Sequence, residues 1–308
     1  MTDYVFVASD LSQIEARVLP WLAKDQDTLD LVAKGMNIYQ VHAVTSMNWT
    51  GGNIQEENAP LYGLAKARTL ALGFQAGHER FLDMARIYIK PAEYALIFGA
   101  PVSEDQVTKY LDYREWLSGK LGHNFEEWLA GWKNLKEQKR RFLINSKAQV
   151  DDYRATNPKI ADPKTGLWAR LDKAAKNACD APDRELVIEL PSGNNITYRG
   201  LKKTNDRVSA TIVRRGSFSK GGLYGGLLAE NVTQSLARDI FVYHLVRAEQ
   251  ELGLDLCLHT HDEIVARVPR VDAEGVKTKL EALMSEAPPW IPTLPVGCKA
   301  EILEFYKK

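Results

Sequence analysis

The chain has 308 residues, and its 40 basic and 40 acidic side chains give a formal net charge of zero at pH 7. Hydrophobic residues make up 45% and charged residues 26%, which is typical of a globular protein and excludes a fibrous or disordered chain. A zero net charge argues mildly against a nucleic-acid partner unless basic residues cluster locally. No apolar run approaches the roughly 18 residues of a membrane-spanning helix, and the three cysteines are widely spaced. We therefore expect a cytoplasmic protein with no membrane partner.

The chain opens with a predicted strand followed by a helix. Residues 4–8 read YVFVA, a short run of β-branched and aromatic side chains that indicates a buried strand. Apolar residues then recur every fourth position over 14–22, which is a helical spacing. Ser12 and Glu15 have the spacing of a capping box, so the helix is predicted to start at Ser12. Asp10 lies between strand and helix, a common position for a functional carboxylate.

The remaining elements predict an α+β fold with an all-helical insertion. Residues 36–184 are mostly helical in pattern, with two or three amphipathic surface helices over 104–149. Two strand-like runs flank PSGN in 185–198 and predict a hairpin, and a long helix is expected over 227–251. The runs DLCLHT and EIVARV then predict a second hairpin, whose tight turn is His261-Asp262.

Asp10 and Asp262 each lie at the tip of a predicted strand. If those strands pair, the two carboxylates meet, and they repel one another unless cations lie between them. Such a site suits Mg²⁺, because two metal ions about 4 Å apart serve phosphoryl transfer. The alternative is that Asp10 caps the helix and Asp262 makes a turn.

Two further patterns have both a functional and a structural interpretation. Tyr62, Lys66, Leu70 and Phe74 are four residues apart on a helix predicted over about 60–75, and a lysine within such a stripe suits a nucleotide. The alternative is a lysine at the edge of a core. The run HTHDE at 259–263 suggests zinc, but no third histidine or cysteine ligand supports it, so the hairpin interpretation is favoured.

Several of these segments resemble the motifs of family A DNA polymerases, the DNA polymerase I class, in their phage form. DLSQIEAR at 10–17 resembles the first polymerase motif, KARTLALGFQAG at 66–77 the second, and HDE at 261–263 the third. LPSGNNITYR, the segment at 225–240 and the C-terminal PWIPTLPVGCKAEILEFYKK also match. The resemblance implies an antiparallel-sheet palm over 1–35 and 185–308 and helical fingers over 36–184, with an unmatched helical insertion near 104–149.

The resemblance also implies an activity and a set of roles. It implies DNA-directed addition of dNTPs to the 3′ end of a primer–template, with two Mg²⁺ ions held by Asp10, Asp262 and the carbonyl of Leu11. Lys66 would bind the triphosphate, and Glu15 would exclude a ribose 2′-hydroxyl. The further nucleotide-binding residues would be Gln13, Tyr39, Leu70 and Phe74, and the DNA-binding residues Gln234, Arg238, His261 and Glu263.

The sequence departs from the family pattern at several positions. Tyr62 occupies a place where the family usually has Arg, and Arg68 is a poorly aimed substitute. Only nine residues precede Asp10, so we expect either a split polymerase, whose thumb and exonuclease lie on a second polypeptide, or a minimal or excised core. Two basic clusters, at 133–141 and 202–220, are candidate DNA surfaces, of which the second is favoured. The alternatives are a non-catalytic DNA-binding or accessory subunit that retains the fold, and a single-subunit RNA polymerase.

Overall fold

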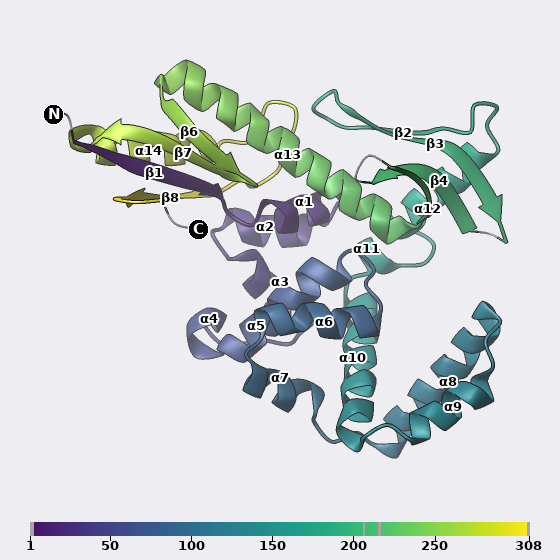
Figure 1. The fold of residues 1–308 in the computed structure, drawn as a ribbon. Helices are drawn as coiled ribbons and strands as arrows, with labels where there is room; N and C mark the ends of the chain where they lie inside the picture. The colour runs from purple at the N-terminus through teal and green to yellow at the C-terminus, as the bar shows by residue number, and fades with distance from the viewer. Residues whose placement is uncertain (1–2, 206, 215–216, 307–308) are drawn as a thin grey trace. The chain divides into compact units, whose positions relative to one another are not determined.

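The computed structural model describes residues 3–205, 207–214 and 217–306 (Figure 1). The chain divides into two compact units, one made of Met1–Ile38 with Leu167–Lys308 and the other of Tyr39–Gly166. The predicted combination of helices with antiparallel strands is confirmed. The interpretation of the parts as palm and fingers, with its boundaries at 35 and 184, stays a prediction.

One sheet of the first unit carries the two strands on which Asp10 and Asp262 were predicted to meet. Its order is β6-β7-β1-β8, and neighbouring strands run antiparallel. The predicted hairpin is confirmed: Asp262 and the residue before it, His261, form the turn between β6 and β7. Asp10 on β1 lies opposite Glu263 on β7. The strands are β1 (Tyr4–Leu11), β6 (Asp255–Thr260), β7 (Glu263–Pro269) and β8 (Cys298–Leu303).

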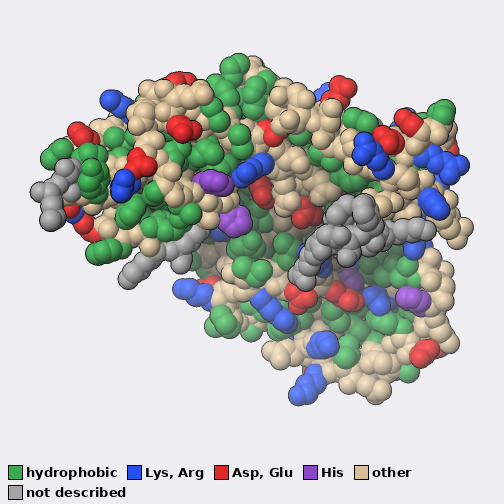
Figure 2. All heavy atoms as spheres, turned by 45° about the horizontal axis from the view of Figure 1, so that its top comes forward, with side chains coloured by type: hydrophobic (Ala, Val, Ile, Leu, Met, Phe, Trp, Pro, Cys, Tyr) green, Lys and Arg blue, Asp and Glu red, His purple; other side chains and the backbone are tan. Residues whose placement is uncertain are grey.

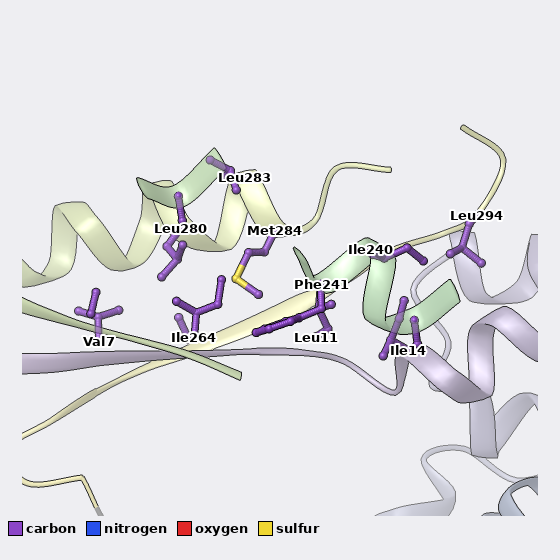
Figure 3. Packing of buried hydrophobic residues seen from close by; sticks show 14 of the residues in the cluster. Val7, Leu11, Ile14, Ile240, Phe241, Ile264, Leu280, Leu283, Met284 and Leu294 are labelled. Atoms are coloured by element: carbon purple, nitrogen blue, oxygen red, sulfur yellow. The ribbon is translucent and has the colours of Figure 1, made fainter. Parts of the chain in front are cut away.

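A hydrophobic core fixes the end of β1. Alternate side chains of this strand face that core, so Val7 and Leu11 are fully buried. Asp10 points to the opposite face of the strand and is exposed. Helices α13 (Gly225–Leu252) and α14 (Ala273–Met284) contribute Phe241 and Met284 to the same cluster (Figure 3). Burial of each such side chain stabilises the fold by about 1.5–3 kcal/mol. The packing therefore holds the strand end, and with it Asp10.

The second sheet of this unit has the order β2-β3-β4-β5, again antiparallel. The hairpin predicted at 185–198 is confirmed by the pairing of β2 with β3, whereas β4 and β5 were not predicted. One face of the sheet packs against α12 (Leu167–Cys179) and the start of α13. The strands are β2 (Leu186–Glu189), β3 (Asn195–Thr204), β4 (Arg207–Arg214) and β5 (Ser217–Leu223).

The first helix begins later than predicted. Helix α1 (Ile14–Leu22) has Gln13 as its N-cap residue, in a left-handed conformation with φ of 56°, and no side-chain cap. Ser12 is outside the helix because its backbone N–H donates to the carbonyl of Gly297, at 2.8 Å. The predicted capping box of Ser12 and Glu15 is therefore wrong. The unit also contains α2 (Gln26–Ala33) and a 3₁₀ turn over Arg270–Asp272.

The described part of the second unit is helical. The amphipathic helices predicted over 104–149 are confirmed: α8, α9 and α10 enclose a small cluster around Tyr110, Trp132 and Ile144. The helix predicted over 60–75 is interrupted, because α5 ends at Ala67 and continues as a π-helical turn over Arg68–Leu72. The helices are α3 (Ile38–Ser46), α4 (Ile54–Glu57), α5 (Ala59–Ala67), α6 (His78–Tyr88), α7 (Pro91–Phe98), α8 (Glu104–Leu121), α9 (Phe125–Lys133), α10 (Glu137–Thr156) and α11 (Pro158–Ala161).

Candidate functional site

Asp10 and Asp262, far apart in the sequence, lie at the same edge of the first sheet. The backbone N–H of Leu11 donates to the carbonyl oxygen of Asp262 at 3.1 Å, so the β1–β7 pairing continues into the hairpin turn. In this register Asp10 lies opposite Glu263, the residue after Asp262, and the Cα atoms of opposed residues in such a pair are about 4.5–5.5 Å apart. Asp10 is exposed and Asp262 half-buried, so both remain accessible. On its other side Asp10 lies opposite Lys299 of β8.

Glu15 adds a third carboxylate near this edge. Burial raises the pKa of Glu15, and the negative charges of Asp262 and Glu230 raise it further, whereas His261 opposes them. These interactions show that the first turn of α1 and Glu230 on α13 lie near the hairpin turn. The cost of this concentration of negative charge falls when a cation binds close by.

The donor atoms at this edge are hard oxygens. The carboxylates of Asp10 and Asp262 and the carbonyl of Leu11 are the ligand types that Mg²⁺ prefers, whereas zinc prefers nitrogen and sulfur. Over 3–205, 207–214 and 217–306, no group of three or more His, Cys, Asp or Glu side chains is placed to hold a metal ion. Asp10, Asp262 and the Leu11 carbonyl are therefore the oxygen donors at this edge that suit Mg²⁺.

A pocket of about 720 Å³ opens beside Asp10. Gln13 lines it, together with Lys299 and Arg17. The Nη1 of Arg17 donates to the carbonyl of Pro295 at 2.9 Å, and burial lowers the pKa of this guanidinium. The pocket thus places two basic side chains and one amide near the exposed carboxylate of Asp10.

Lys66 lies among aromatic rings in the second unit. Its Nζ is 5.7 Å from the ring centroid of Tyr39 and 5.1 Å from that of Tyr88, which are distances of cation–π interactions. Tyr62 packs edge-on against Tyr39, with 5.8 Å between centroids. The ammonium of the half-buried Lys66 therefore lies against aromatic rings. Because the rings carry no formal charge, they do not neutralise the positive charge, which can attract an anion.

The predicted stripe keeps its accessibility despite the π-helical turn. Tyr62, Lys66, Leu70 and Phe74 are all half-buried, whereas the other residues over 63–73 are buried. The stripe is therefore the side of this segment that a ligand could reach, although the wider turn changes the angular spacing of Leu70 and Phe74 relative to Lys66.

Arg68 does not substitute for the family arginine. Its side chain is 2% exposed and donates to His42 Nε2 at 3.2 Å, Gln149 Oε1 at 2.8 Å and Asp152 Oδ2 at 2.7 Å. These bonds tie the π-helical turn to α3 and α10. The sequence marks Arg68 only as a poorly aimed substitute, and in the structure its guanidinium is committed to the interior of the second unit.

The predicted DNA-binding residues lie on two elements of the first unit. Gln234 and Arg238 are exposed and one helical turn apart on α13. His261 is exposed in the hairpin turn with φ of 51°. Glu263 is half-buried and accepts a hydrogen bond from the hydroxyl of Tyr306 at 3.0 Å.

Sequence reasoning missed Glu230, Tyr88 and Tyr306. The sequence could have indicated Glu230, because it lies one turn before Gln234 on the same side of the helix predicted over 227–251. Tyr88 and Tyr306 had none, because each meets its partner only through the tertiary fold. Among the described residues, no helix is long and apolar enough to cross a membrane.

Comparison with known proteins confirms the resemblance to DNA polymerases. The chain is 26% identical over 310 residues to the DNA polymerase of Bacillus phage SP02, covering 98% of this chain and 41% of that polymerase. No protein-family model matches the sequence.

The fold, in turn, is similar to that of the polymerase domain of Pol1 from M. smegmatis, solved in complex with DNA primer–template and dNTP. The TM-score is 0.51 with 16% identity, over 98% of this chain and 40% of that chain. The chain thus spans about two fifths of the length of each relative.

Proposed function

We propose that the chain is the palm-and-fingers catalytic core of a family A DNA polymerase that adds dNTPs to a primer 3′ end. The observation that carries the proposal is the β1–β7 pairing, which brings Asp10 and Asp262 to one exposed sheet edge through the Leu11–Asp262 hydrogen bond of 3.1 Å. The similarity to a phage DNA polymerase and to a polymerase domain that binds primer–template and dNTP supports this interpretation.

Asp10, Asp262 and the Leu11 carbonyl would hold two Mg²⁺ ions. When bound, such ions lower the pKa of an attacking hydroxyl and neutralise charge on a leaving pyrophosphate. The two aspartates supply the negative charge that retains the ions. Burial and the charge of Asp262 raise the pKa of the nearby Glu15, so cations that balance Asp262 would remove part of the repulsion on the Glu15 carboxylate.

The remaining residues would bind and position the substrates. Lys66 would place its ammonium on the triphosphate and stabilise the charge that develops on the leaving group. Glu15 would occupy the space of a ribose 2′-hydroxyl. The nucleotide would also contact Gln13, Tyr39, Leu70 and Phe74, and the primer–template would contact Gln234, Arg238, His261 and Glu263.

The test is primer extension by Asp10→Ala and Asp262→Ala, with Asp272→Ala as a matched control. Asp272 is exposed and its side chain caps no helix, so its removal should leave extension unchanged. Both site variants should lose extension by at least about 10³-fold while they retain the wild-type unfolding midpoint. Activity that survives in both folded variants would contradict the proposal.

A binding assay separates the polymerase from a non-catalytic DNA-binding or accessory subunit. A catalytic core binds dNTP in a manner that depends on Mg²⁺ and on both aspartates. A subunit that merely retains the fold binds DNA without that dependence. Extension should be measured with and without a second polypeptide that carries thumb or exonuclease, because the need for such a partner is part of the proposal.

A further inference from the structure

The sheet β2-β5 has one face that packs against the protein and one that faces solvent. Leu201 of β3, Val208 of β4 and Leu223 of β5 are buried in a cluster with residues of α12 and α13. On the opposite side, Thr211 and Arg207 of β4 are exposed. Successive side chains of these strands therefore point alternately to the core and to solvent, so the sheet has a separate solvent-facing surface.

A β-bulge gathers basic residues on the solvent side. Arg199 lies opposite Thr211 and Lys202 lies opposite Ser209, although three residues along an undisturbed strand would face opposite sides. Gly200 makes this bulge possible, because its φ of +63° is a left-handed conformation that other residues rarely adopt. The bulge thus turns both Arg199 and Lys202 toward solvent.

The resulting solvent side is cationic and rich in hydroxyls. Arg207 lies opposite Thr204, so it is a diagonal neighbour of Lys202, roughly 7–8 Å away on the same side of the sheet. Lys220 has the register position opposite Thr211. Figure 2 shows Lys and Arg side chains, with some Asp and Glu among them, on the part of the first unit that carries β3 and β4 in Figure 1.

Two acidic residues among those that the structure describes lie toward the β2 side of the sheet. Glu185, just before β2, pairs with the Nε of Arg199 at 2.9 Å, and Glu189 ends β2. Lys202 and Arg207 are both exposed on β3 and β4. Asp206 and Arg215, part of the same sequence cluster, lie outside the described residues. Among the described residues, the exposed positive charge of Lys202 and Arg207 therefore lies on β3 and β4.

Hydrogen bonds fasten this sheet to α13. Asn231 of α13 donates to the hydroxyl of Tyr198 on β3 at 2.6 Å. The carboxylate of Asp239 accepts hydrogen bonds from the turn between β2 and β3. Asp239 directly follows Arg238, and Gln234 is one turn earlier, so these residues of α13 and the cationic sheet belong to the same compact unit.

We infer that the solvent side of β3 and β4 binds the sugar–phosphate backbone of duplex DNA, with Lys202 and Arg207 as its principal contacts. The inference rests on the proposed polymerase function and extends its DNA surface beyond α13. Lysine and arginine neutralise phosphates, and the hydroxyl of the exposed Thr211 is suited to donate to phosphate oxygens. Such contacts carry no base specificity, which suits an enzyme that must accept any sequence.

The test is the salt dependence of duplex binding by Lys202→Ala/Arg207→Ala, measured by fluorescence anisotropy without Mg²⁺ or dNTP. Two lost phosphate contacts should make the slope of log K against log salt shallower by about 1.8. Between about 50 and 200 mM salt, the wild type should then lose about twelvefold more affinity than the variant. Lys277→Ala/Lys279→Ala on α14 removes the same charge elsewhere and should keep the wild-type slope.

A charge-conserving variant, Lys202→Arg/Arg207→Lys, should also keep the wild-type slope, which separates lost charge from lost folding. An unchanged slope for the alanine variant, or a slope lowered equally in the α14 control, would overturn the inference. So would a loss seen on single-stranded oligonucleotide and not on duplex. Because no catalysis is measured, failure of primer extension by the wild type together with the second polypeptide would refute the polymerase proposal and leave this result intact.

Discussion

His244 on α13 gives the sharpest prediction about stability. Its side chain is 0% exposed, and neither ring nitrogen has a hydrogen-bond partner among the described residues. Burial is the main cause that lowers its pKa from 6.5 to about 4; Arg247 lowers it further, and Glu286 opposes them. The imidazole is therefore neutral in the folded protein and becomes protonated when the chain unfolds below pH 6.5.

The sign and size of the effect follow from these pKa values. Between pH 6.5 and 4 the unfolded chain binds more protons at this residue, so stability falls as pH falls. With 1.36 kcal/mol per pKa unit, His244 should lower the free energy of unfolding by about 2 kcal/mol between pH 7 and pH 5. His42 and His78 are also buried, with pKa values lowered to about 3 and 4, and should add to the loss.

The assay is urea unfolding of the wild type and His244→Leu at pH 7 and pH 5. Leucine removes two unpaired buried nitrogens, so the variant should be as stable as the wild type or more stable at pH 7. At pH 5 the free energy of unfolding of the variant should exceed that of the wild type by about 2 kcal/mol more than at pH 7. For an m-value of about 3 kcal/mol/M in urea, this is a difference of about 0.7 M in the unfolding midpoint. His123→Leu, at an exposed histidine, is the control. An identical pH dependence in wild type and His244→Leu would refute the reasoning.

Three further variants test other parts of the account. Arg68→Ala should destabilise the protein by about 3 kcal/mol in urea unfolding, because it breaks a buried, charged network, whereas Arg86→Ala, in an exposed pair, should cost less than about 0.5 kcal/mol. Equal losses would contradict this. Glu15→Ala should reduce discrimination of dNTP over rNTP in primer extension by roughly 10- to 100-fold; unchanged sugar selection would rule out its proposed role. Tyr88→Leu should raise the Kd for dNTP about two- to fivefold by removing one cation–π contact of Lys66, while Tyr88→Phe should bind nearly as well.

The sequence was informative wherever local pattern and tertiary structure agree. The apolar runs before Asp10 and around Asp262 become β1, β6 and β7. The β-branched side chains of β1 and β7 fill a common core, to which the largely exposed β6 adds Leu256. The long helix α13 and the hairpin of β2 and β3 were found for the same reason. The polar–apolar alternation of RVSATIVR over 207–214 is typical of a strand and indicates β4. The basic residues of the same segment indicate a surface cluster, and β4 was not predicted.

The errors come from partners that are distant in the sequence. Ser12 has the spacing of a helix cap, but its N–H bonds to Gly297 near the other end of the chain. Arg68 lies in a regular helical pattern, and its partners come from α3 and α10, where no local signal marks them. The same holds for Tyr88 beside Lys66. Such contacts form only when the fold is complete.

The central claim is that Asp10 and Asp262 together hold divalent ions, and anomalous diffraction from crystals grown with Mn²⁺ and dNTP tests it most directly. We predict two anomalous peaks about 4 Å apart, in contact with both carboxylates and the Leu11 carbonyl. Carboxylates more than about 8 Å apart in that complex, or manganese bound only elsewhere, would contradict the account, because two such ions could not bridge the gap.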